Sequence, residues 1–129
     1  MRIPGLSLAF DGTGVVWRPT RSRGVSWFPL EPRVEAGAGG GGAVLIRMEP
    51  GCGYPPHRHL EPGEEVLVLE GGYEDERGLW RAGDWVAYEA GSTHSPRALG
   101  DPDLPVGPSN PACVLLAVAR GGTERLSPH

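Results

Sequence analysis

The chain has 129 residues, with 12 positively and 16 negatively charged side chains and a formal net charge of −4. This length suits one domain with a modest core, and the acidic balance, without a basic stripe, disfavours nucleic acid or an anionic membrane as partner. No apolar run approaches the roughly 18 residues of a membrane span, and the first residues lack the apolar segment of a secretory signal. We therefore expect a cytoplasmic protein.

Glycine (21 residues) and proline (14 residues) make up more than a quarter of the chain. Such a proportion can indicate disorder, but here the apolar residues are concentrated in short β-type runs. A turn-rich all-β domain needs glycine and proline at its corners. The composition therefore favours a globular all-β domain.

No segment shows sustained helical periodicity, whereas short apolar runs bounded by Gly, Pro or Asp recur, as is typical of a β-sandwich or barrel. In chain order, strands are predicted weakly near residues 6–10 and 15–17, strongly at 25–30, 43–48 and 66–69, weakly near 79–81, and strongly at 85–89 and 114–119. Residues 71–78 predict a hairpin. Residues 98–111, with four prolines, predict a long loop that is either a lid or a tolerated insertion, and the insertion is favoured.

Three of the four histidines lie in two short clusters, and the fourth, His129, ends the chain. His57 and His59 follow Pro55 and Pro56, which prevent a helix there. In an extended chain, residues two apart point to the same face, so His57 and His59 can bind one ion. Two imidazoles and a carboxylate suit Zn, Fe, Mn, Ni or Cu.

Three glutamates follow the first histidine pair and are candidates for the carboxylate ligand. Glu61 precedes Pro62 and Gly63, which predict a turn, so its side chain is expected to face solvent. Glu64 and Glu65 point to opposite faces of the next strand. Because both faces of residues 66–69 are apolar, alternation alone leaves the choice between them open.

The second cluster contains His94, which follows a strand and the turn at Gly91. Taken alone, such a histidine is more often a surface or packed residue than a ligand. Together, however, the two clusters resemble the paired motifs of the cupin superfamily. The first motif, G-x5-H-x-H-x4-E-x6-G, is matched at every defined position, and its spacing selects Glu64 over Glu65; the matching residues are Gly51, His57, His59, Glu64 and Gly71.

The second cupin motif, G-x5-P-x-G-x2-H-x3-N, is matched by Gly83, Gly91 and His94. Glu89 stands in place of the proline and Ala98 in place of the asparagine. Neither position is a ligand in the family pattern. Glu89 is therefore either a pocket acid or an exposed turn residue, and the exposed turn is favoured.

Residues 64–71, 73–76, 82–85 and 94–96 are similar to one cupin branch, which contains the cupin domain of ChrR-type zinc anti-sigma factors and the acetylacetone-cleaving dioxygenases. The resemblance runs from about residue 25 to 119. It implies an all-β, single-domain cupin β-barrel (a double-stranded β-helix or jelly roll) over residues 25–120, an N-terminal arm over 1–24 that packs on the barrel, and a C-terminal tail over 121–129. Related small cupins pair as dimers, so a homodimer is expected.

The resemblance also implies a site with one divalent metal ion, Zn, Fe, Mn or Ni, held by His57, His59, Glu64 and His94. The candidate pocket walls are aromatic: Trp27, Phe28, Tyr54, Trp80, Trp85 and Tyr88. Zinc would complete a tetrahedron with these four ligands, whereas Fe, Mn or Ni would keep two octahedral positions open. The identity of the metal therefore separates the hypotheses on function.

Three functions are compatible with such a site. The first is a metal-dependent, non-haem oxygenase-type enzyme acting on a small oxygen-rich molecule such as a dicarbonyl, although diketone-cleaving relatives are typified by three histidines without the carboxylate. The second is a non-catalytic ligand-binding or sensing cupin, as in the zinc anti-sigma factor. The first 50 residues contain no His or Cys, so they do not resemble the separate zinc-binding helical domain that binds sigma factors. In the third, the metal only stabilises the barrel.

Overall fold

The computed structural model describes residues 1–31 and 41–126; His129 and the rest of residues 127–129 lie outside it, as do residues 32–40. Over the described residues the chain forms strands and turns and no helix. The first six strands are β1 (Arg18–Pro19), β2 (Val25–Pro29), β3 (Gly42–Met48), β4 (His57–His59), β5 (Glu64–Glu70) and β6 (Gly72–Asp75). The others are β7 (Gly78–Arg81), β8 (Trp85–Tyr88), β9 (Thr93–His94), β10 (Arg97–Ala98), β11 (Cys113–Ala119) and β12 (Thr123–Arg125).

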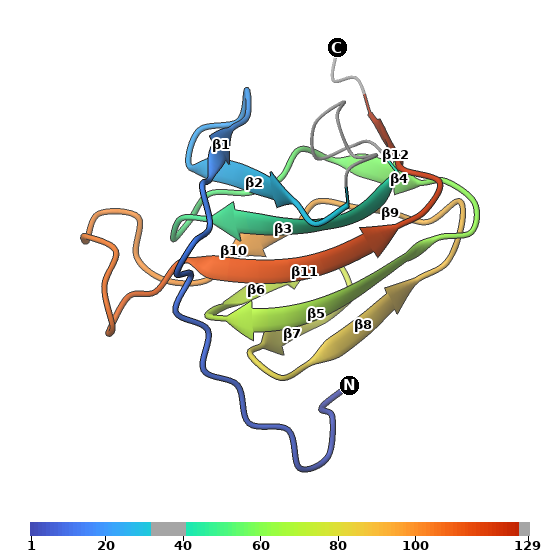
Figure 1. Cartoon of the computed structure of the whole chain (residues 1–129). Coiled ribbons are helices and arrows are strands. Elements are labelled where there is room, and N and C mark those ends of the chain that lie inside the picture. Colours follow the sequence, from blue (N-terminus) through green and yellow to red (C-terminus); the bar gives the residue numbers. More distant parts are fainter. Residues whose placement is uncertain (32–40, 127–129) are drawn as a thin grey trace.

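Three antiparallel sheets make up the domain. A six-stranded sheet has the order β1-β2-β3-β11-β5-β8 and runs across the front of Figure 1. A sheet of β10-β6-β7 lies behind it, and a sheet of β12-β4-β9 lies near the end at which β5 begins. The expected all-β architecture is confirmed, although the three sheets do not close into a continuous barrel.

The strongly predicted strands are all present, each within a few residues of its expected bounds, and the predicted hairpin is the pair β6 and β7. The weak predictions at residues 6–10 and 15–17 are wrong. Residues 6–10 alternate between half-buried and exposed but have no neighbouring strand with which to form a ladder. The short strands β1, β9, β10 and β12 escaped prediction because two or three residues are too few to show a period of two.

The core lies on the inward faces of the long strands. In β5 the inward set is Glu64, Val66 and Val68, and Glu65 faces solvent. Cross-strand pairs from β3 and β11 of the same sheet, such as Ile46 with Leu115, continue this buried face beside β5. Glu64 is therefore at the end of an otherwise apolar stripe, which places its carboxylate inside the domain.

The outer edge of β8 is covered by other parts of the chain. Trp85 exchanges backbone hydrogen bonds with Met1, and Arg77 Nη1 donates to the carbonyl of Ala87 at 2.7 Å. Covering an edge strand in this way removes a surface on which another sheet can pair. None of the described residues belongs to a helix long and apolar enough to cross a lipid bilayer.

Candidate metal centre

The four predicted ligands come from three short or terminal pieces of strand. His57 and His59 are buried on the same face of β4, and Arg58 between them is exposed, as the period of two predicts. His94 in β9 is directly opposite His57 across the strand pair. Glu64 is the first residue of β5 and pairs with Tyr88 of β8. Residues far apart in sequence are thus brought to one point by sheet register.

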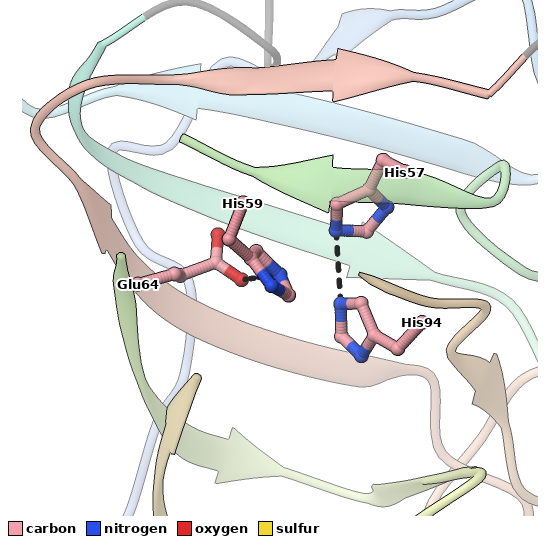
Figure 2. A group of neighbouring side chains, drawn as sticks. All are labelled: His57, His59, Glu64 and His94. Atoms are coloured by element: carbon pink, nitrogen blue, oxygen red, sulfur yellow. Dashed lines mark hydrogen bonds and ion pairs between the residues drawn. The ribbon is translucent and has the colours of Figure 1, made fainter. Parts of the chain in front are cut away.

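The four side chains point toward one another, as Figure 2 shows. Each offers one ligand atom, and these atoms all lie within 4.8 Å of one another. The residues are almost inaccessible, with exposed fractions of 4% for His57, 1% for His59, 8% for Glu64 and 5% for His94. Ligands on opposite sides of one ion are about 4.2 Å apart, twice a metal–nitrogen bond of about 2.1 Å, so a small contraction suffices to surround an ion.

A hydrogen bond at Nδ1 orients each imidazole. His57 Nδ1 donates to the carbonyl of Pro55 at 2.8 Å, and His94 Nδ1 donates to Asp75 Oδ2 at 2.9 Å. His59 Nδ1 is 2.9 Å from Ser92 Oγ, whose own proton goes to the carbonyl of Glu89 at 2.6 Å. Ser92 Oγ therefore accepts a hydrogen bond from His59 Nδ1. All three rings carry the proton on Nδ1, which leaves Nε2 with a free lone pair.

Three Nε2 lone pairs and one carboxylate consequently face a common centre. The Nε2 atoms of His57 and His94 are 2.9 Å apart, and His59 Nε2 is 3.2 Å from Glu64 Oε1. His59 Nε2 is also buried without a hydrogen-bond partner. Buried acceptors that face one another without a donor are unfavourable, and a divalent cation at their centre removes this conflict. The donor set therefore fits a metal ion.

The surroundings of His57 and His94 favour the neutral imidazole, which is the form that binds metals. Burial, with the neighbouring His94, lowers the pKa of His57 from 6.5 to about 4. Burial also lowers the pKa of His94, although Asp75 opposes this shift. Burial opposes ionisation of Asp75, but hydrogen bonds from Tyr88, His94 and others outweigh it and lower the pKa of this carboxyl group.

Asp75 belongs to a buried network that we did not predict from the sequence. Tyr88 donates its hydroxyl proton to Asp75 Oδ2 at 2.5 Å, and the hydroxyls of Tyr73 and Tyr88 are 2.6 Å apart. Burial raises the pKa of both tyrosines far above the usual range, so both remain protonated donors. The only sequence signal was that residues 73–76 share the resemblance to the cupin branch, which assigns no role to Asp75.

A cavity of about 20 Å³ adjoins His57, Glu64 and His94, enough for about one water or one ion. Its walls combine aliphatic side chains with three hydroxyl groups. The aliphatic residues include Ile46, Met48, Val66, Leu115 and Ala117, and the hydroxyls belong to Tyr54, Tyr73 and Thr123. Tyr54 and Thr123 are only partly buried, so the mouth of the cavity lies between them.

Of the six aromatic residues expected as pocket walls, only Tyr54 lines this cavity. Trp27 packs in the apolar core instead, and the ring of Tyr88 lies against His59 and His94 with centroids 4.9 and 4.3 Å away. Trp80 packs partly buried against the same core, and Phe28 and Trp85 are half-buried outside it.

Glu89 lies outside the buried cluster. Its side chain is 82% exposed and 3.8 Å from Arg77 Nη2. It borders a wide surface hollow of about 620 Å³ that reaches the outer side of Glu64 and Tyr88 and is rimmed by charged side chains, among them Glu65, Arg77 and Arg120. This hollow is larger than the inner cavity, but no imidazole of the cluster lines it.

Comparison with known protein families gives a match to the ChrR Cupin-like domain over residues 8–103. Among functionally curated proteins, none matches this chain. The structure is similar to one chain of the complex of Rhodobacter sphaeroides SigE with the anti-sigma ChrR, with a TM-score of 0.58 and 28% sequence identity. That similarity covers 80% of this chain but 47% of the other, so the present chain spans about half of its relative.

Two further structures are similar in fold alone. An RmlC-like cupin from Ralstonia eutropha JMP134 has a TM-score of 0.65 at 19% identity, covering 95% of this chain and 74% of that chain. The polyketide cyclase RemF from Streptomyces resistomycificus has a TM-score of 0.61 at 17% identity, and the similarity covers 96% of this chain and 88% of that chain.

Proposed function

The chain belongs to the family of ChrR cupin-like domains, and from that premise we propose that it holds one divalent metal ion with His57, His59, Glu64 and His94. One observation carries the proposal. Three imidazole lone pairs and a carboxylate meet at a buried point to which no other described side chain donates a hydrogen bond. Only a cation satisfies all four groups at once.

We further propose that the protein is an oxygenase-type enzyme for a small oxygen-rich molecule such as a dicarbonyl. When bound, a ferrous, manganous or nickel ion would supply Lewis acidity and two further coordination positions. The chain would supply the surroundings. Met48 and Ile46 exclude water from the cavity, and Tyr54 and Thr123 flank its mouth.

Among the described residues, no other set of catalytic groups lines this cavity. All three described histidines belong to the cluster, and the thiol of Cys113 is buried in the apolar core, where burial raises its pKa. A nucleophile paired with a spare histidine is therefore absent among the described residues. Reactivity in the cavity would depend on the bound ion.

The test is metal analysis of protein purified anaerobically, followed by oxygen uptake with small 1,3-dicarbonyls. We expect about one Fe, Mn or Ni per chain, and oxygen consumption that the His57→Ala variant lacks. Stoichiometric zinc in the native protein, with no oxygen consumption after iron loading, would reject the oxygenase proposal but leave the metal site intact.

A metal-dependent sensing module is the second candidate. Its support is the similarity to a chain of an anti-sigma complex and the small size of the cavity, which admits little more than one ion without movement of Tyr54. A sensor should change its binding to a protein partner when the metal is removed or oxidised. Pull-down with the loaded protein and with the chelated protein distinguishes the two candidates, since an enzyme needs no such partner.

We also propose that the protein is a cytoplasmic homodimer. Dimerisation cannot use the outer edge of β8, because Met1 and Arg77 already occupy the backbone groups of Trp85 and Ala87. Light scattering coupled to size exclusion gives the mass directly. A mass of 13.7 kDa at micromolar concentration would correspond to a monomer and reject the dimer.

A further inference from the structure

Asp75 lies at the end of β6 with its side chain 0% exposed. Its Oδ2 accepts from the Tyr88 hydroxyl at 2.5 Å and from His94 Nδ1 at 2.9 Å. Its Oδ1 accepts from the Arg77 amide at 2.9 Å and from Trp80 Nε1 at 3.3 Å. All four hydrogen-bond partners of Asp75 are donors. A protonated carboxyl group would instead need one acceptor for its own proton. The contacts therefore identify Asp75 as a buried carboxylate anion.

Asp75 and Glu64 together place two negative charges inside the domain. The side chain of Glu64 is 9% exposed. His57 and His94 donate through Nδ1, and their Nε2 atoms face each other at 2.9 Å. Two protonated rings would repel each other at this distance, so these rings do not balance the two carboxylates. Arg77 lies over the ring of Tyr88 at 4.9 Å, but its side chain is 40% exposed and faces Glu89. Buried charges need partners, and one divalent ion would balance both carboxylates.

The cavity beside the ligands contains no cation of its own. Its lining includes aliphatic groups, hydroxyls, two of the imidazoles and Glu64, but no arginine. A carboxylate or phosphate in this space would contact no positively charged side chain among the lining residues, and the nearby Arg125 lies outside the lining, on the Tyr54 side. The bound ion is already balanced by Glu64 and Asp75.

On the basis of the proposed metal site, we propose that Asp75 balances the charge of that site through His94, so that the loaded centre takes a ligand that arrives uncharged and rejects permanent anions. Asp75 does not touch the ion or the ligand; it is a positioning residue that acts through the His94 ring. The ligand class is a small neutral molecule with a carbonyl, enol or alcohol oxygen. The aliphatic side chains of the cavity would pack against the carbon atoms of this molecule. The hydroxyl groups of Tyr54 and Thr123 would form hydrogen bonds with its polar end.

The first experiment compares the wild-type protein with Asp75→Asn, which removes the charge with little change in volume. Cobalt(II) affinity, measured by competition with a chelator, should fall about 10- to 100-fold in Asp75→Asn, as is usual when the outer partner of a ligating histidine is lost. The loaded proteins are then titrated with azide, and binding is followed in the cobalt absorption spectrum. Azide should bind to Asp75→Asn more tightly, by on the order of tenfold, because one nearby negative charge is gone.

One variant serves as a control. Glu74→Gln removes an exposed charge from the neighbouring position of β6, and it should bind azide as the wild type does. Equal azide affinity in the wild type and in Asp75→Asn would overturn the charge-balancing role, even if cobalt affinity fell, because a purely structural role would change cobalt binding alone.

A second measurement uses the wild type only and does not depend on the folding of Asp75→Asn. Acetamide and acetate have nearly the same shape but differ by one charge. Acetamide should perturb the cobalt spectrum at lower concentration than acetate, and tighter binding of acetate would overturn the inference. A wild-type protein that fails to bind cobalt(II) at one ion per chain would instead reject the proposed metal site, and this inference with it.

Discussion

The Nε2 atoms of His57 and His94 lie 2.9 Å apart across the β4–β9 strand pair. Both Nδ1 atoms already donate, to Pro55 and Asp75 respectively, so the two Nε2 atoms face each other as acceptors. A proton between them is disfavoured by burial, which lowers the pKa of both rings. The sheet register therefore creates a position that a metal ion suits better than a proton does.

The identity of the ligands can be tested by substitution. His57→Ala, His59→Ala and His94→Ala should each reduce Zn²⁺ or Co²⁺ affinity by more than the about 10- to 100-fold that loss of an outer hydrogen-bond partner costs. Glu64→Gln should have a smaller effect, because the amide oxygen can still coordinate. Glu65→Gln, on the exposed face of β5, is the matched control. If Glu65→Gln proved the damaging change in equilibrium dialysis, Glu64 would not be the carboxylate ligand.

Ser92 should contribute to metal affinity through the orientation of His59. Ser92→Ala removes the acceptor that lies 2.9 Å from His59 Nδ1, so metal affinity should fall by about tenfold. Ser92→Thr keeps an Oγ atom and should restore most of the loss. Ser109→Ala, at an exposed position in the loop over residues 98–111, should leave the affinity unchanged. An unaltered chelator competition curve for Ser92→Ala would contradict this role.

The metal-free protein should lose stability as the pH falls from about 6.5 to about 4. In the unfolded chain His57 has its ordinary pKa of 6.5, whereas in the folded protein burial and His94 lower this pKa to about 4. The unfolded state therefore binds more protons in this window, and the free energy of unfolding decreases with decreasing pH. This pKa shift corresponds to a loss of about 3 kcal/mol in the free energy of unfolding. Urea unfolding in the presence of EDTA, repeated across this pH range, measures the loss, and the free energy of unfolding of His57→Gln should depend less on pH.

Gly71 should tolerate substitution less well than Gly91, although both belong to the cupin motifs. Gly71 has a φ of +66°, and an added Cβ would lie 2.5 Å from the carbonyl oxygen of Ala112. Gly91 also has a positive φ, +86°, but an added Cβ there meets nothing within 4 Å. Gly71→Ala should therefore lower the free energy of unfolding by an amount near the upper end of about 1–3 kcal/mol. Gly91→Ala should lower it by about 1 kcal/mol. Equal midpoints in urea unfolding would show that close approach to Ala112 is unimportant.

Tyr54 should limit access to the cavity. Its ring packs edge-on against His57 with centroids 5.0 Å apart, and it lines the cavity together with Thr123, the other partly buried residue of the lining. Tyr54→Ala should therefore accelerate removal of bound Co²⁺ by EDTA, whereas Leu79→Ala, at an exposed position 55% accessible to solvent, should not. An unchanged rate of removal for Tyr54→Ala would place the mouth elsewhere.

Local sequence features were sufficient to predict the first half of the site. Pro55 and Pro56 exclude a helix, and the period of two in an extended chain puts His57 and His59 on one face, as the structure confirms. The longer strands were predictable as apolar runs bounded by Gly, Pro or Asp. These predictions need only information from neighbouring residues.

The remaining features depended on tertiary structure. Alternation within the chain left Glu64 and Glu65 as equal candidates for the carboxylate ligand. The spacing of the cupin motif favoured Glu64. In the structure, β5 lies between β11 and β8, and the Glu64 side chain is buried. The partnership of Asp75 with His94 joins residues 19 positions apart through a hairpin and a two-residue strand. No local pattern encodes such a contact, because it arises only when separate sheets pack face to face and their buried polar groups must find partners.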